Sequence, residues 1–328
     1  MYKANSPYLS VVIPLFNEEE SIPELLKQLF SVCQSLGRSF ELVLVDDGSQ
    51  DKTAELLLKS AEKDPRIKVV RFSRNFGHQA AFNAGMDMAS GEVIITMDGD
   101  LQHPPHLIPE FIKYSEAGYD IVIGERVKNK QNSKVREKTG GLFYKFLSAI
   151  TNLEFKNASD FALYKRSVLN VLKKMPEKER FLRGLVQWVG FKKKYVPYVV
   201  EARKHGTAKY NFKKLLSLIT SGVTSFSAFP LRLAFWAGLF IFSASIIFSG
   251  YVVVDHYIHP NPLIPGWATV VILVTGLGSF QLIVLGIVGE YLYKMFNEIK
   301  GRPLYIVSET YNLDKEGIES SPYGIYSN

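Results

Sequence analysis

Two long runs without a charged residue constrain this chain most. The first, Leu233–Val254, continues for 22 residues, and the second, Trp267–Gly289, has Gln281 as its most polar member. At a helical rise of about 1.5 Å per residue the first run reaches roughly 33 Å, which matches the thickness of a bilayer core. The runs therefore predict two membrane-spanning helices. The alternative is a buried helical pair in a soluble protein.

The basic residues around these runs predict their orientation. The connector DHYIHPNPLIPG contains no Lys or Arg, whereas the flanks carry Lys213, Lys214, Arg232, Lys294, Lys300 and Arg302. Basic residues are retained preferentially on the cytoplasmic side of a membrane. The N-terminus MYKANSPY lacks the apolar region of a signal peptide. We therefore expect a plasma or inner membrane protein with both termini in the cytoplasm.

The N-terminal part, from residue 8 to about 125, alternates strand and helix patterns. Short apolar runs, rich in β-branched residues, are LSVVIPLF, FELVLVDDGS, IKVVRFS, EVIITMD and DIVIGER. Helical spacing separates them at 18–36, after residue 51, at 77–89 and at 106–117, with Ser49 or Asp51 as a cap for the second helix. This order predicts an α/β domain with a mostly parallel sheet covered by helices.

Polar residues gather where the predicted strands end. They are Asn17 and Glu18, Asp46 and Asp47, Asp98-Gly99-Asp100, and Arg126. In an open α/β sheet, ligands bind outside the carboxyl ends of the strands. We therefore expect these separate loops to converge on one site.

The Asp98-Gly99-Asp100 turn is a candidate metal site. Two carboxylates one residue apart, with the amide oxygen of Gln102 nearby, are oxygen ligands that suit Mg²⁺ or Mn²⁺. The same pattern also occurs by chance in many loops. Neither a G-x-x-x-x-G-K-[ST] motif nor a G-x-G-x-x-G motif after the first strand is present. A metal-bound nucleotide diphosphate is therefore a better candidate ligand than a dinucleotide.

The charge balance favours anionic partners. The formal net charge is +7, and the segment from Arg180 to Lys214 contains ten Lys or Arg residues against a single acidic one, Glu201. Apolar residues then follow at helical spacing: Phe212, Leu215, Leu216, Ile219, Val223 and Phe226. A basic amphipathic helix directly before a span is typical of the headgroup plane of a membrane. The alternative is an ordinary solvated helix face.

The single cysteine, Cys33, excludes an intramolecular disulfide.

Several segments together resemble a known family. They are SVVIPLFNEEESI, LVLVDDGSQDKT, FSRNFGHQAAFNAGMDMASGEVIITMDGDLQHPP, IVIGER and HGTAKY. The chain resembles family 2 glycosyltransferases of the GT-A fold over about residues 8–300. Within them it is most similar to the polyprenyl-phosphate glycosyltransferases, which include dolichyl-phosphate mannose synthase and the bacterial bactoprenol glucosyltransferases.

This resemblance implies an enzyme and its partners. It implies inverting, metal-dependent transfer of a single sugar, glucose from UDP-glucose, to polyprenyl (undecaprenyl) phosphate at the cytoplasmic membrane face, with Mg²⁺ or Mn²⁺ as cofactor. The expected partners are a nucleotide sugar, the lipid phosphate and the membrane, with no nucleic acid. Small residues in the spans favour a homo-oligomer.

The resemblance also implies a division of the chain. Residues 1–209 form the cytoplasmic GT-A domain, 210–231 the amphipathic juxtamembrane helices, 232–292 the two spans with a short external loop, and 293–328 a cytoplasmic tail. Because the segment after about Tyr311 is polar and rich in Gly and Ser, we expect it to be disordered.

Site roles on the nucleotide side follow from the same resemblance. Pro14, Phe16, Asn17 and Glu18 line the base and ribose, and Asp46 and Asp47 close that pocket. For Glu18 and Asp47 the alternative role is helix capping. Asp98 faces the ribose or the metal, and Asp100 and Gln102 bind the metal.

On the acceptor side the resemblance implicates basic residues and one carboxylate. Arg126 and Arg136 are candidates to bind the acceptor phosphate, and Arg203 and Lys209 the donor diphosphate; each is otherwise a solvated charge. Asp160 lies near the acceptor. A phosphate monoester, whose second pKa is about 6, is largely dianionic near neutral pH, so Asp160 need only orient it or accept a residual proton.

Two further features of the acceptor region are less settled. The relatives often carry Arg two positions after this Asp, where this chain has Ala162; Lys165 or Arg166 could substitute. His78, His103 and His205 lack zinc-ligand spacing, so we expect turn or supporting roles for them.

Three other functions compete with this interpretation. A processive polysaccharide synthase carries Q-x-x-R-W, which the nearest string, RGLVQWVG, does not match. A non-catalytic nucleotide-sugar binding protein would not need the complete Asp-Gly-Asp-x-Gln set. A lipid transporter would need more spans and intramembrane charges than two uncharged runs provide.

Overall fold

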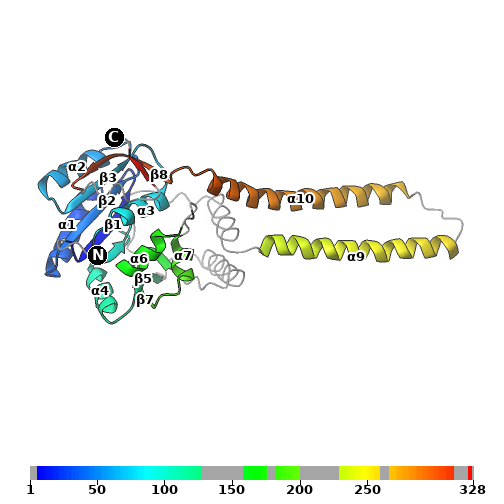
Figure 1. The fold of residues 1–328 in the computed structure, drawn as a ribbon, viewed down its shortest axis with the longest axis horizontal. Helices are drawn as coiled ribbons and strands as arrows, with labels where there is room; N and C mark the ends of the chain where they lie inside the picture. The colour runs from blue at the N-terminus through cyan, green and yellow to red at the C-terminus, as the bar shows by residue number, and fades with distance from the viewer. Residues whose placement is uncertain are drawn as a thin grey trace. The chain divides into compact units, whose positions relative to one another are not determined.

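The computed structural model describes residues 6–127, 158–175, 177, 182–199, 229–258, 266–313 and 324–326. The chain divides into two compact units, one made of Met1–Lys214 with Arg302–Asn328 and the other of Leu215–Gly301. The helices and strands of each unit are shown in Figure 1.

Strands and helices alternate through the first 127 residues, as the sequence predicts. They are β1 (Leu9–Leu15), α1 (Ile22–Ser35), β2 (Phe40–Asp46), α2 (Thr53–Lys63), β3 (Ile67–Phe72), α3 (His78–Met88), β4 (Val93–Thr96), the 3₁₀ turn η1 (Pro105–Leu107), α4 (Ile108–Glu116) and β5 (Ile121–Val127). β1 and β2 are buried along their whole length, as expected of strands covered on both faces. The first helix begins later than predicted, because Glu18 to Ser21 form a turn closed by the Ser21 N–H and the Glu18 carbonyl.

The four central strands are parallel. Their order in the sheet is β3-β2-β1-β4, so β1 lies between β2 and β4. From β1 the chain therefore continues to β2 and β3 on one side of β1, and it then crosses to β4 on the other side. In doubly wound sheets, ligands bind at the point where the strand order reverses in this way.

Helices cover both faces of this sheet. On one face, Leu25 of α1, Leu57 of α2 and Phe111 of α4 belong to the same buried core as the odd-numbered residues of β1. On the other face α3 packs against β1 and β2, where its Gly85 lies against Val12 and Val45. The predicted α/β architecture is thereby confirmed.

A second set of elements extends the sheet beyond β4. It comprises β6 (Ala158–Lys165), α6 (Arg166–Lys173), α7 (Leu182–Trp188) and β7 (Lys193–Val199). β6 runs antiparallel between β4 and β5, and β7 pairs parallel with β5. The sequence patterns did not predict these strands.

The C-terminal residues return to the sheet. β8 (Tyr305–Tyr311), labelled in Figure 1, pairs antiparallel with β3. β9 (Gly324–Tyr326) pairs parallel with β8. Tyr305 is fully buried, stacks on Phe72, and donates its hydroxyl to Asp87 Oδ2 at 3.1 Å. The expectation of a disordered segment after about Tyr311 is therefore wrong for β9, because the backbone of β9 pairs with β8 as the last strand of the sheet.

The second unit contains the two predicted apolar helices. α9 (Phe229–Ile258) and α10 (Trp267–Ile299) are both longer than the uncharged runs. Within them Pro230–Phe248, with mean hydropathy 1.9, and Gly276–Ile299, with mean hydropathy 1.3, are long and apolar enough to cross a membrane. The predicted amphipathic helices fall mostly on 210–228, which lie outside the described residues.

Candidate active site

The loop after β1 is tied to the loop after β2. The Asn17 N–H donates to Ser49 Oγ at 3.0 Å, and Asn17 Oδ1 accepts the Gln50 N–H at 2.8 Å. The Glu18 N–H donates to Thr53 Oγ1 at 2.8 Å. Asn17 has a positive φ of 55°, which Asn tolerates better than most residues. These bonds fix both loops at the same edge of the sheet.

The other predicted nucleotide residues differ in exposure and in partners. Pro14 is buried within β1, whereas Phe16 is exposed at the edge of the sheet. Glu18 Oε2 accepts the hydroxyl of Ser21, the residue before α1, so this side chain also supports the start of that helix. Asp51 Oδ1 accepts the Thr53 N–H at 2.9 Å, at the first residue of α2. The N-cap residue itself is Lys52, so neither Ser49 nor Asp51 occupies the cap position, and Asp51 supports the start of the helix from one residue before that position.

Asp46 and Asp47 hold backbone loops. Asp46 is fully buried, and its Oδ1 accepts the Ser49 N–H at 2.9 Å. Asp47 Oδ1 accepts the Phe76 N–H at 2.7 Å, and its Oδ2 accepts the Gly77 N–H at 3.0 Å. Burial raises the pKa of Asp47, and these two backbone donors only partly offset it. Asp47 therefore fixes the loop that leads into α3 rather than capping N–H groups within the helix, and its place in the nucleotide pocket stays a prediction.

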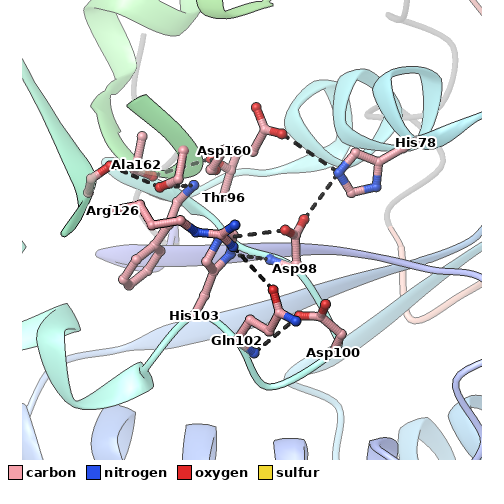
Figure 2. Close-up of polar contacts among 12 residues, drawn as sticks. His78, Thr96, Asp98, Asp100, Gln102, His103, Arg126, Asp160 and Ala162 are labelled. Carbon is pink, nitrogen blue, oxygen red and sulfur yellow. Dashed lines mark hydrogen bonds and ion pairs between the residues drawn. The ribbon is translucent and has the colours of Figure 1, made fainter. Parts of the chain in front are cut away.

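The Asp-Gly-Asp turn begins two residues after the end of β4, and Figure 2 shows its two carboxylates, Asp98 and Asp100. The Asp98 N–H donates to His103 Nδ1 at 2.8 Å, and Asp100 Oδ1 accepts the Gln102 N–H at 3.1 Å. Leu101 has a positive φ of 62°, a strained conformation for a residue with a side chain. The Gln102 side-chain oxygen accepts from Arg126 Nη2 at 3.1 Å. The turn thus holds two carboxylates while Gln102 and Arg126 pair with each other.

The buried His103 imidazole holds Asp98 in place. It stacks on the Phe161 ring at 5.2 Å. Because Nδ1 accepts a hydrogen bond, the ring proton is on Nε2, which lies 3.5 Å from Asp98 Oδ2. Burial lowers the pKa of His103 despite the neighbouring carboxylates. A neutral imidazole in this tautomer orients Asp98, in line with the predicted supporting role.

Antiparallel pairing brings Asp160 to the same place. β4 and β6 pair up to Thr96 opposite Ala162, and just beyond this pair His78 Nε2 lies 3.1 Å from Asp98 Oδ1 and 3.9 Å from Asp160 Oδ2. The Thr96 hydroxyl donates to the Asp160 carbonyl at 2.6 Å, which fixes this end of the pair. The donor-side and acceptor-side carboxylates that the resemblance implied are therefore neighbours.

Arg183 is a site residue that the sequence analysis missed. From α7 its guanidinium binds the Asp160 carboxylate in a bidentate way, Nε to Oδ1 at 2.9 Å and Nη2 to Oδ2 at 2.8 Å. Lys165 instead lies near Asp120, and Arg166 donates to the Gly91 carbonyl. Neither of them substitutes for an arginine at position 162, because Lys165 ends β6 and Arg166 begins α6, at the end of the strand away from Asp160.

His78 was expected to have only a turn or supporting role, but it contacts two of the site carboxylates. Its Nε2 lies 3.1 Å from Asp98 Oδ1 and 3.9 Å from Asp160 Oδ2 (Figure 2). Burial lowers the pKa of His78, but the contact with Asp98 and the charge of Asp160 outweigh it, and the net pKa is raised. For Asp98 burial raises the pKa, and the two histidines reverse this to a net lowering.

Comparison with known proteins identifies the family. The model of the glycosyl transferase family 2 matches residues 10–172. The uncharacterized glycosyltransferase YkcC of Bacillus subtilis is 39% identical over 94% of this chain and 95% of its own length. The prophage-derived bactoprenol glucosyl transferase of Shigella flexneri is 36% identical over 92% of this chain and 98% of its own length.

The chain belongs to glycosyl transferase family 2. The resemblance drawn from the sequence is thereby confirmed, and the sheet described above is the GT-A-like α/β fold of this glycosyltransferase. Among solved structures, glucosyl-3-phosphoglycerate synthase of Mycobacterium tuberculosis, in complex with Mn²⁺, UDP and phosphoglyceric acid, is 18% identical with a TM-score of 0.48. The structural match covers 66% of this chain and 76% of the synthase chain.

The glycosyltransferase offers oxygen ligands for a divalent cation at the Asp-Gly-Asp turn. Asp98 and Asp100 are both partly exposed and stand on one short turn. Within the described residues no group of three or more His, Cys, Asp or Glu side chains is arranged around a metal position. Mg²⁺ is commonly held by one or two carboxylates plus substrate phosphates, so this donor set fits a cation shared with a diphosphate.

The remaining predicted site residues of the glycosyltransferase are Arg136, Arg203, Lys209 and His205. They lie outside the described residues, and their roles stay predictions.

Proposed function

We propose that this glycosyltransferase transfers one glucose from UDP-glucose to polyprenyl phosphate, with inversion, at the cytoplasmic face of the membrane. The pairing of β4 with β6 carries the proposal, because it sets the candidate metal carboxylate Asp98 beside the candidate acceptor residue Asp160. The relatives support the substrate class: the Shigella flexneri protein is a bactoprenol glucosyl transferase by name.

The chain's own residues account for the chemistry. An oxygen of the lipid phosphate attacks the anomeric carbon, the bond from that carbon to the diphosphate oxygen breaks, and UDP leaves. Asp98 and Asp100 would hold a Mg²⁺ or Mn²⁺ ion, which neutralises charge on the leaving diphosphate. Arg183 holds Asp160 in place to orient the acceptor phosphate, which is already largely dianionic at neutral pH.

The apolar helices support a membrane location. Large apolar side chains on α9 and α10 are mostly exposed within the described residues, among them Phe240, Ile247 and Ile299. Surfaces this apolar are unfavourable in water and mark contact with lipid or protein. We propose that both helices span the membrane and keep the active site near its lipid acceptor.

A donor panel tests the proposal. Purified full-length protein is incubated with radiolabelled nucleotide sugars, undecaprenyl phosphate and either MgCl₂ or MnCl₂. We expect a lipid product carrying one glucose, formed only when the divalent cation is present. A polymeric product would instead support a processive synthase, and UDP binding without any product would support a non-catalytic binding protein.

A further inference from the structure

His78 presents a hydrogen-bond donor between the two sides of the site. Ionised carboxylates only accept hydrogen bonds, so the Nε2 atom that faces Asp98 and Asp160 carries a proton. About half of the His78 side chain is exposed, at 48%, so a ligand can reach this donor. A group bound between Asp98 and Asp160 would therefore meet the His78 N–H.

The position of His78 is built into the fold. Asp47 accepts the N–H groups of Phe76 and Gly77, the two residues before His78. The turn at Gly48 lies directly against the backbone of Arg74, which leaves no space for a side chain. The imidazole also packs edge-on against Phe82 at 4.6 Å. Three contacts thus fix the start of α3 and aim the imidazole at the carboxylates.

Arg183 provides a second donor at the same point. Its Nη2 lies 2.8 Å from Asp160 Oδ2, the same oxygen that lies 3.9 Å from His78 Nε2. The Arg183 side chain is one-third exposed, at 34%. A phosphoryl group has several oxygens and accepts hydrogen bonds from histidine and arginine together. Two donors that converge on one carboxylate oxygen can converge in the same way on a phosphoryl oxygen.

We propose that His78 is a substrate-binding residue that, with Arg183, donates a hydrogen bond to a phosphoryl oxygen of a bound substrate. The ligand is either the phosphate monoester of the acceptor or the diphosphate of the nucleotide sugar. The inference rests on the proposed function for the identity of these two ligands.

Two variants of His78 test the inference in the full-length protein. His78→Phe removes the donor and keeps a ring, whereas His78→Gln keeps an N–H at a similar reach. His106→Phe, at an exposed histidine of η1, is the matched control. Calorimetry measures the dissociation constants of UDP with Mn²⁺ and, separately, of a short-chain polyprenyl phosphate, and a thermal scan measures stability.

We expect His78→Phe to weaken one of these ligands by about tenfold to a hundredfold, the range for a hydrogen bond to a charged group. His78→Gln should recover part of that loss, and His106→Phe should match the wild type. Weaker polyprenyl phosphate binding would assign the acceptor as the ligand, and weaker UDP binding would assign the donor.

Two results would overturn the inference. One is His78→Phe and His78→Gln binding both ligands within twofold of the wild type. The other is an equal loss of both ligands with a lower unfolding temperature, which indicates a structural role. If the wild type transfers no sugar to polyprenyl phosphate but His78→Phe still weakens UDP, the proposed function fails and the inference stands. If the wild type transfers sugar to polyprenyl phosphate but both His78 variants bind both ligands within twofold of the wild type, the inference fails and the proposed function stands.

Discussion

At the scale of single residues, the site depends on carboxylates held by neighbours of different kinds. Asp98 is oriented by a buried neutral imidazole, and Asp160 by a bidentate guanidinium. Asp100, on the same turn as Asp98, is partly exposed. An anionic oxygen ligand is what a hard divalent cation requires, so the charge of Asp100 matters more than its shape.

Asp100→Asn should therefore abolish transfer, with a loss of more than about a hundredfold, because it replaces an anionic oxygen by a neutral amide of the same size. Initial rates at saturating Mg²⁺ measure the effect. Glu110→Gln, at an exposed position in the first turn of α4, is the control for the loss of one surface charge. Turnover near the wild-type rate in Asp100→Asn would exclude a ligand role for this residue.

Gly48 offers a second test at this scale. It has a positive φ of 69°, and a side chain there would collide with the Arg74 backbone. Gly37 also has a positive φ, 63°, but has open space around it. Gly37→Ala should cost about 1–2 kcal/mol from backbone strain alone. Gly48→Ala should cost more and should also reduce transfer, because the displaced loop leads to His78.

Denaturant unfolding measures the stability of the two alanine variants, and initial rates measure their transfer activity. Together they distinguish the effect of backbone strain, present in both variants, from that of the collision with the Arg74 backbone, present only in Gly48→Ala. Equal stability losses, with full activity in both, would show that the contact between the Gly48 turn and the Arg74 loop does not position the site.

At the scale of elements, a buried polar cluster ties four strands together at the edge opposite the active site. Glu41 of β2 accepts from Ser10 of β1 at 2.5 Å and from the Ser90 N–H, just before β4, at 2.7 Å. Lys68 of β3 lies 2.6 Å from its other oxygen. Burial raises the pKa of Glu41, but Lys68 and the hydrogen bonds lower it by more than burial raises it, so the net pKa is below the ordinary value.

This depressed pKa predicts how stability depends on pH. The unfolded chain binds the Glu41 proton more tightly than the folded chain, so the stabilisation is complete above the ordinary pKa and is lost as pH falls through the folded one. The free energy of unfolding of wild type should exceed that of Glu41→Gln at about pH 7, and the difference should shrink towards about pH 3. A difference that stays constant over this range would contradict the prediction; Glu110→Gln serves as the exposed control.

At the scale of the whole molecule, the chain leaves the catalytic sheet, forms two apolar helices and then returns to the sheet through β8. If both helices span the membrane, residues before α9 and after α10 lie on the same side, whereas the connector between them lies on the other. β8 pairs with β3 of the catalytic unit, which agrees with that arrangement.

Cysteine labelling tests this topology. Burial raises the pKa of Cys33 to about 12, so the native thiol should not react. In intact cells a membrane-impermeant maleimide should label Asn261→Cys, in the connector, but not Ser308→Cys, on an exposed part of β8. After permeabilisation both should react. Labelling of Ser308→Cys in intact cells would reverse the proposed orientation.

The sequence by itself determined the features that local patterns encode. Alternating strand and helix periods predict the parallel core, polar residues at strand ends predict the site edge, and the absence of charge predicts the two long helices. Each of these signals depends on residues a few positions apart, where periodicity is directly readable.

Only the tertiary structure decided which distant segments meet. The pairing of β4 with β6 sets Asp160 beside Asp98, Arg183 arrives from α7, and the α3 loop delivers His78. β8 joins the sheet after two long helices. Strand partners are selected by packing and backbone hydrogen bonding between segments far apart in the chain. A local sequence pattern therefore does not predict which two strands will pair.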